Sequence, residues 1–170
     1  MALGPVFIKQ LELSYGALFR NLEGITHDES LRMPSGGGNC LNWVVGHIIS
    51  ARSRLMKQLG VAPVWQIDLA FFYSGRDEAS WSPQKALDLK SLLTDLARSQ
   101  QELMNALEAL QEPMLTTPDE KGRTLADALT FFHFHETYHG GQVALLRRTL
   151  GHPGVIRPAP LRPEPDLIES

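Results

Sequence analysis

The chain has 170 residues, a formal net charge of −3 and 43% hydrophobic residues, which predicts one domain with its own hydrophobic core. The small net charge argues against general binding to nucleic-acid phosphates, and no apolar run is long enough to span a bilayer. A single cysteine, Cys40, excludes an internal disulfide, and residues 1–16 lack the pattern of a secretory signal. We therefore expect a soluble cytoplasmic protein with no nucleic-acid or membrane partner.

The first half of the chain predicts two helices, because apolar residues recur at steps of three and four and no segment alternates as a strand would. The first helix covers residues 7–25. The second covers residues 39–59, with Asn39 as its candidate N-cap and Gly60 as the residue that ends it.

The second half predicts two more helices. Ser82 followed by Pro83 is a strong start signal, because serine caps a helix and proline fits its first turn, so the third helix is expected to begin there. The fourth begins at Thr124, where Asp127 three residues later is close to a capping box, and it continues to Leu150.

Four helices with one apolar stripe each bury those stripes best as a four-helix bundle, so we expect an all-α domain over residues 1–151. The long connection 60–81 can cross the bundle, which would let the second and third helices run parallel. Residues 26–38 and 112–123 are shorter loops. The prolines of residues 152–170 predict an extended C-terminal tail.

The fourth helix contains a motif with two interpretations. FHETYHGGQ, residues 134–142, includes the HExxH signature of zinc peptidases at His135, Glu136 and His139. In those enzymes the glutamate is the general base and a third ligand follows downstream. No such ligand follows here at a recognised offset, and Gln142 stands where the extended motif needs glycine. The peptidase interpretation is therefore disfavoured, and Glu136 is kept as a candidate general base.

The same histidines are candidate metal ligands. His135 and His139 interrupt an otherwise apolar stripe, so we place both rings in the core of the bundle. Residues four apart lie about 40° apart around a helix, so both rings can reach one ion. His47, in the apolar segment LNWVVGHIISA, is the candidate third ligand. The alternative is that each is a core histidine satisfied by hydrogen bonds. Three more histidines are expected to lie on the surface or to contact the ligands without binding the metal: His27, His133 and His152.

Two segments resemble a known family: GGGNCLNWVVGHIISA, residues 36–51, and HETYHGGQVALLRRTLG, residues 135–151. The first is similar to the loop and second helix of the DinB/YfiT-like family of metal-dependent enzymes, and the second to its HxxxHxGQ element. The resemblance places the family's three metal ligands on His47, His135 and His139. It implies a left-handed bundle in up-down-down-up order, a divalent metal such as zinc or nickel, and a homodimer.

Three neutral imidazoles leave a divalent ion with an open position, where it lowers the pKa of bound water to about 7 or activates a thiolate. Some relatives in the family transfer low-molecular-weight thiols, so the resemblance implies a thiol S-transferase or a hydrolase that acts on a small molecule. The alternative is a non-catalytic bundle in which the metal only joins two helices. Imidazole ligands do not select one ion, so iron, copper and manganese are candidates beside zinc and nickel.

Several other side chains are candidates for supporting roles. Gln142 and Tyr138 lie within reach of the ligand rings and are candidate hydrogen-bond partners for them. Arg52 and Arg54 either meet an anionic substrate or lie on a solvated face. Cys40 is expected to be a small buried residue. The connection offers apolar residues for a dimer interface: Val64, Trp65, Phe71 and Phe72.

Overall fold

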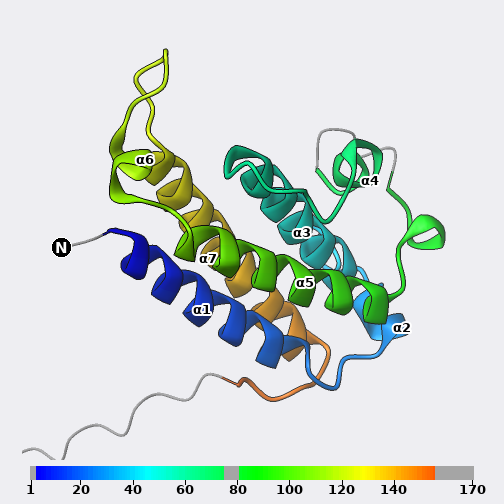
Figure 1. The fold of residues 1–170 in the computed structure, drawn as a ribbon. Coiled ribbons are helices and arrows are strands. Elements are labelled where there is room, and N and C mark those ends of the chain that lie inside the picture. The colour runs from blue at the N-terminus through cyan, green and yellow to red at the C-terminus, as the bar shows by residue number, and fades with distance from the viewer. Residues whose placement is uncertain (1–2, 75–80, 156–170) are drawn as a thin grey trace, which may run out of the picture.

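The predicted all-α class is confirmed over the residues that the computed structural model describes, 3–74 and 81–155, which contain seven α-helices and no strand (Figure 1). Four helices are long: α1 (Leu3–Leu22), α3 (Leu41–Gln58), α5 (Leu89–Glu108) and α7 (Leu125–Thr149). The connections hold α2 (His27–Ser30), α4 (Ile67–Phe72), the 3-10 helix η1 (Pro83–Lys85) and α6 (Glu112–Thr116). Residues 156–170 of the predicted tail lie outside the described ranges. No helix within those ranges is long and apolar enough to cross a membrane.

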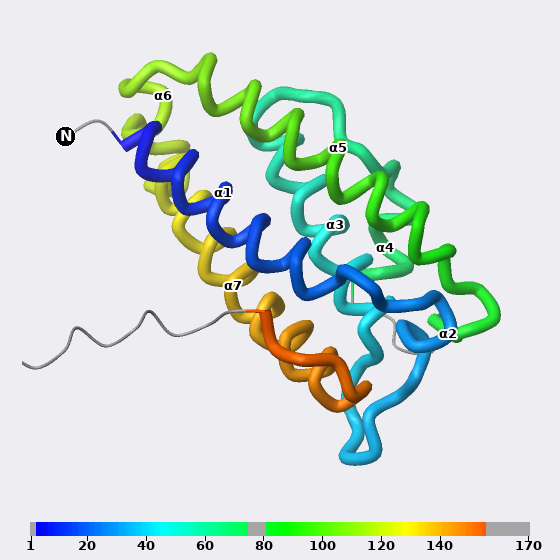
Figure 2. Tube along the Cα trace, turned by 90° about the horizontal axis from the view of Figure 1, so that it is seen from below, coloured from blue at the N-terminus to red at the C-terminus, as the bar shows by residue number. Residues whose placement is uncertain are grey.

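The four long helices pack side by side, and each contacts two of the others. α1 lies between α5 and α7, and α3 contacts the same two helices from the opposite side of the bundle (Figure 2). α3 and α7 are therefore neighbours, although about 87 residues separate the middles of the two helices. This neighbourhood brings the two candidate metal-binding segments together.

A polar layer divides the core into two apolar clusters. One cluster lies toward α2 and α4 and takes Leu18, Ile48, Leu92 and Val143 from the four long helices. The other lies toward α6 and takes Leu11, Leu55, Leu103 and Leu129. Between them, every long helix contributes polar side chains: Ser14, Arg52, Ser99, Gln100 and Glu136. The two clusters supply the apolar burial that holds the bundle together, about 1.5–3 kcal/mol for each fully buried large side chain.

Two predicted helix starts need correction. Ser82 and Pro83 open only η1, and α5 begins at Leu89, where the Asp88 carboxylate accepts backbone N–H groups in the first turn. An aspartate at the N-cap satisfies donors that Ser82, several residues earlier, cannot reach. α3 has Cys40 at its N-cap, so Asn39 is not the cap that its residue type suggested.

The start of α7 is confirmed. The Thr124 side chain accepts the Asp127 N–H, and the Asp127 carboxylate accepts the Thr124 N–H, which is a complete capping box. The loops expected at 26–38 and 112–123 contain short helices, α2 and α6.

The connection between α3 and α5 is described up to residue 74, and residues 75–80 of it lie outside the described ranges. Its helix α4 packs on α3. Trp65 and Tyr73 are buried in the core, so the aromatic residues here serve mainly to attach the connection to the bundle. The Tyr73 ring lies directly over Gly46, where an added Cβ would come within 2.2 Å of its Cδ1 atom. A glycine at position 46 is what lets the connection approach α3 so closely.

Candidate metal centre

Three histidines meet between α3 and α7. His47 lies in the middle of α3, and His135 and His139 lie one turn apart on α7. One ring nitrogen of each lies within 4.8 Å of those of the other two, a grouping that can hold a metal ion. The structure thus brings together the three residues that the sequence singled out.

Hydrogen bonds to the ring nitrogens orient two of the three histidines. His47 Nδ1 lies 2.8 Å from the Tyr73 carbonyl oxygen, and His139 Nδ1 lies 2.7 Å from Gln142 Oε1. Both partners are acceptors, so each Nδ1 carries the proton and each Nε2 keeps its lone pair. This arrangement prepares His47 and His139 to bind a metal through Nε2. Gln142 makes the hydrogen bond to a candidate ligand ring that its position suggested.

The third ring is incompletely satisfied without a cation. His135 Nε2 lies 3.0 Å from His47 Nε2, and His135 Nδ1 is a buried nitrogen with no hydrogen-bond partner among the described residues. Two nitrogen lone pairs at this distance repel unless a proton or a metal ion lies between them. Buried polar atoms without partners are rare in folded proteins. The donor set therefore fits a divalent ion that accepts imidazole nitrogen.

The environment keeps these imidazoles neutral, as metal binding requires. Burial, the largest cause, lowers the pKa of His47 and of His135 to about 4. The positive charge of Arg54 is a smaller cause that acts on both. Burial also lowers the pKa of His139, although its hydrogen bond to Gln142 opposes the shift. All three imidazoles are therefore neutral at neutral pH, each with a single ring N–H.

The two α7 histidines lie at the rim of the bundle, which corrects their predicted place in the core. The most deeply buried stripe of α7 runs through Leu129, Phe132, Glu136 and Val143, and His135 and His139 are only half-buried beside it. Neighbouring stripes of a helix overlap at 3.6 residues per turn, so the apolar pattern alone did not decide which one faces inward. The rim position leaves the candidate metal centre open to a cavity on one side.

Glu136 faces the core and is engaged on both oxygens. Its Oε2 accepts from Arg52 Nε at 2.7 Å, and its Oε1 accepts from Arg52 Nη2 at 2.8 Å and Ser14 Oγ at 2.7 Å. A peptidase-type general base must instead meet the water beside its zinc ion. The geometry thus favours a structural role for Glu136, and its role as a general base stays an untested prediction. Arg52 is fully buried, so both surface interpretations of this residue are corrected.

The remaining candidates lie away from the triad or beside it. The His27 Nδ1 atom accepts the Leu89 N–H, and His152 pairs with Glu29 at 3.0 Å. Tyr138 stacks edge-on against His139 but is largely exposed. Cys40 is buried, as expected, and burial raises the pKa of its thiol.

Two contacts to His47 had no clear signal in the sequence. The Trp43 ring stacks on the His47 ring at 4.8 Å, and the Tyr73 carbonyl holds its Nδ1. The position of Trp43 one turn before His47 on α3 suggests the stacking in retrospect. A backbone carbonyl is common to all residues, so nothing in the sequence marks Tyr73.

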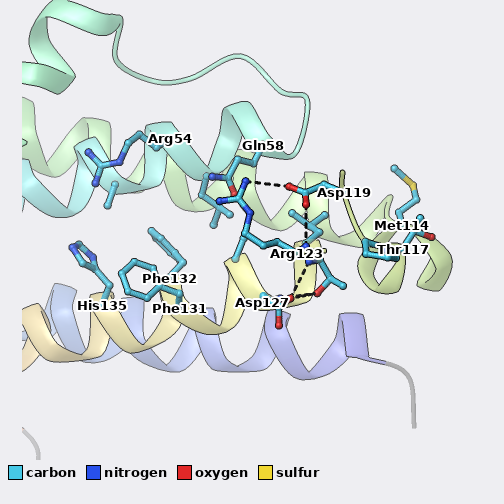
Figure 3. A pocket seen from close by; sticks show the side chains of 16 residues that line it. Arg54, Gln58, Met114, Thr117, Asp119, Arg123, Asp127, Phe131, Phe132 and His135 are labelled. Carbon is cyan, nitrogen blue, oxygen red and sulfur yellow. Dashed lines mark hydrogen bonds and ion pairs between the residues drawn. The ribbon is translucent and has the colours of Figure 1, made fainter. Parts of the chain in front are cut away.

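A cavity of about 790 Å³ opens beside the triad, and His135 forms part of its wall (Figure 3). α3 contributes Arg54 and Leu55, and α7 contributes Phe131 and Phe132. Phe131 is 67% exposed, and its ring centroid lies 6.1 Å from that of His135. A volume of this size accommodates a small molecule.

Comparisons with known proteins agree with this fold. A crystal structure of a conserved protein from Enterococcus faecalis has a TM-score of 0.69 at 17% identity, covering 88% of this chain and 98% of that one. An uncharacterised protein from Escherichia coli UTI89 has a TM-score of 0.64 at 12% identity, covering 88% and 95%. No protein with a curated description matches. The DinB superfamily model matches residues 10–143, most of the chain, including all three histidines. The chain therefore belongs to the DinB superfamily.

Proposed function

We propose that this protein is a metal-dependent enzyme that acts on a small molecule, either by transfer of a low-molecular-weight thiol or by hydrolysis. The observation that carries the proposal is the position of the three histidines. Their ring nitrogens lie within 4.8 Å of one another, and one of the rings lines a cavity large enough for a substrate. A metal site that is purely structural has no need of such a cavity.

In this proposal His47, His135 and His139 hold a divalent ion, with zinc or nickel as the first candidates. Such an ion supplies a Lewis acid that makes a weak nucleophile reactive at neutral pH. The protein's own part is to position the ligands and the substrate. The Tyr73 carbonyl and the Gln142 amide keep the Nε2 lone pairs of His47 and His139 turned toward the ion, and the cavity holds the substrate against His135.

Two other functions are less well supported. A peptidase would need a carboxylate at the ion, and the Glu136 carboxylate is held in the core by Arg52. A non-catalytic bundle would use the ion only to join α3 and α7. These helices are already joined by the Arg52–Glu136 ion pair, so an additional metal link adds little to their attachment.

The proposal is tested by assays of the metal-free, zinc-loaded and nickel-loaded protein. Each form is given pairs of thiols and electrophiles, and separately small esters and amides. Turnover that needs the metal and disappears in His47→Ala is the expected result. A protein that binds the ion tightly, turns over nothing in either panel and has a fourth protein ligand on the ion is a structural metalloprotein instead.

We also propose the left-handed, up-down-down-up order that the resemblance implies. In its support, α1 and α7 are joined from Ser14 to Glu136 near their middles and from Asn21 to Arg147 near their ends, as parallel helices are. α3 and α5 are joined in the same parallel sense, near their N-terminal ends and at the polar layer.

A homodimer is the last part of the proposal, with a revised interface. In the connection, Trp65 is buried in the core and Phe71 is exposed. A larger apolar surface lies along the outer face of α7, where Phe134, Tyr138 and Leu145 are each at least 59% exposed. These three residues lie within about 40° of one another around the helix, so they form one stripe. Exposed apolar stripes of this kind are typical of protein interfaces.

A further inference from the structure

The cavity beside the triad is apolar where it meets the metal centre. Phe131, Phe132 and His135 lie together at one end of it (Figure 3). Leu55 of α3 also lines the cavity, and both Leu55 and Phe132 belong to the buried core cluster toward α6. The ring centroid of the exposed Phe131 lies 6.1 Å from that of His135. A ligand that reaches His135 through this cavity therefore lies against aromatic and aliphatic carbon.

The formal charges of the cavity wall cancel one another. Two arginines and two aspartates line it: Arg54, Arg123, Asp119 and Asp127. His135 adds no charge at neutral pH, because burial lowers its pKa to about 4. The wall as a whole therefore has no net charge that would attract an acid or a base.

Three of the four charged side chains lie away from the metal centre and are bound by the protein. Figure 3 shows Asp119, Arg123 and Asp127 at the opposite end of the cavity from His135. Arg123 Nη2 lies 3.1 Å from Asp119 Oδ2, and Asp127 Oδ2 accepts the N–H and the hydroxyl of Thr124. A ligand that lies against His135 therefore finds no charged partner among these three groups.

Arg54, the fourth charged side chain, is also engaged by the protein, since its Nη1 donates to Ser50 Oγ at 3.1 Å. An ionised ligand loses hydration when it enters an apolar cavity, and this loss costs free energy unless new partners replace the water. An uncharged ligand avoids most of this cost. Gln58 in the same wall offers such a ligand an amide group, which both donates and accepts hydrogen bonds without a charge.

We propose that the cavity binds an uncharged small molecule with an aromatic body, which lies against Phe131 and Phe132 beside the metal centre. The proposal rests on the proposed function, because it names the class of molecule on which the centre acts. Aromatic rings pair with their centroids about 4.5–7 Å apart, so a ring stacked on Phe131 lies close to His135. The volume of about 790 Å³ has room for the ring and for a reacting group such as an ester, an amide or an electrophile.

The test compares ligands that share one aromatic body and differ in charge. Phenylpropionamide, phenylpropionate and phenylpropylamine are titrated calorimetrically into the metal-free and the zinc-loaded protein. The metal-free form excludes direct binding of a carboxylate or an amine to zinc. In that form we expect the amide to bind about tenfold or more tightly than either charged ligand. A charged ligand that binds as tightly as the amide, or an amide that does not bind at all, would overturn the proposal.

A matched pair of variants locates the binding site. Phe131→Ala removes one aromatic wall of the cavity and should weaken binding of the amide by about threefold to tenfold. Phe134→Ala is the control, because Phe134 lies on the same helix and is 65% exposed, against 67% for Phe131, but does not line the cavity. The control should leave the affinity for the amide unchanged. Equal effects of the two substitutions would show that the amide binds outside the cavity, which contradicts the proposal.

The same measurements separate this proposal from the proposed function. Circular dichroism and competition with a chelator establish that each variant is folded and binds zinc as the wild type does. Zinc-dependent turnover by a protein that binds the charged ligands as tightly as the amide would overturn the uncharged ligand class and leave the proposed function standing. Selective binding of the amide by a protein that holds no zinc would support the ligand class and overturn the proposed function.

Discussion

The Arg52 guanidinium and the Glu136 carboxylate form a two-point ion pair at 2.7 and 2.8 Å, with side chains that are 0% and 1% exposed. Arg52 Nη1 donates further to Ser99 and Gln100, and Ser14 donates to Glu136, so all four long helices meet at this level. Burial of a charge pair is costly unless the remaining donors and acceptors are satisfied, as they are here. The pair also sets the register of α7 on α3, one residue from the metal ligand His135.

Removal of one partner of the Arg52–Glu136 ion pair should strongly destabilise the protein. Glu136→Leu leaves the Arg52 charge buried and unpaired, so we expect a loss of about 3–5 kcal/mol in the free energy of unfolding, measured by urea denaturation. The double variant Arg52→Met with Glu136→Leu should be more stable than Glu136→Leu alone, because no unpaired charge is left. If Glu136→Gln instead abolishes turnover with unchanged stability and metal affinity, the general-base role is restored and the structural role is wrong.

The metal triad should respond to each ligand separately. His47→Ala, His135→Ala and His139→Ala each remove one imidazole and should weaken zinc binding by more than the roughly 10–100-fold expected for the supporting variant Gln142→Leu. Competition with a chelator measures these affinities. His133→Ala is the control, since His133 neighbours the site on α7 but is not part of the group. Wild-type protein that binds zinc, nickel, copper or iron no more tightly than the triple alanine variant would show that the site does not exist.

The contact of Tyr73 with Gly46 should couple the connection to the metal centre. In Gly46→Ala, the new methyl group meets the Tyr73 ring at 2.2 Å, so the ring has to move and carry its carbonyl away from His47. We expect a loss of about 1–3 kcal/mol in stability together with weaker zinc binding. Gly140→Ala is the matched control on α7, because nothing lies within 4 Å of its added Cβ and alanine favours the helix. Equal zinc affinity in the two variants would contradict the coupling.

The outer face of α7 should govern association. Leu145→Glu places a charge in the exposed apolar stripe and should convert the proposed dimer to a monomer, as measured by light scattering. Leu13→Glu on α1 is the control, because Leu13 and Leu145 are both 64% exposed but only Leu145 belongs to the stripe. A wild-type protein that is monomeric at high concentration would rule out the dimer.

Glu29 should contribute to stability in a defined pH range. The Thr26 N–H, then the side chains of His152 and Thr26, lower the pKa of Glu29 from 4.5 to about 2. A carboxyl with a lower pKa in the folded state stabilises above its unfolded pKa, and the contribution is lost as the pH falls. The stability difference between wild type and Glu29→Gln should therefore be complete above about pH 5 and vanish near pH 2. Glu102→Gln, at an exposed position in the middle of α5, should show no such dependence.

The sequence by itself determined the helical class and the three histidines. Apolar residues at steps of three and four give each helix one apolar stripe, and a bundle buries all of these stripes. Histidines within apolar helical segments stand out because a hydrophobic core offers few hydrogen-bond partners for an imidazole. The capping box at Thr124 could be recognised because its two side chains are only three residues apart. These features depend on residues that are close together in the chain, so they can be recognised in the sequence.

Only the tertiary structure decided which stripe of α7 faces inward. His135 and Glu136 lie on overlapping stripes, and Glu136 enters the core because Arg52, 84 residues away, satisfies its charge there. The same packing moved the histidines to the rim beside the cavity and brought the Tyr73 carbonyl onto His47. These relationships join groups that are distant in the chain, and one of them is a backbone atom that every residue has. Their energies depend on burial and distance, which exist only after the helices have packed.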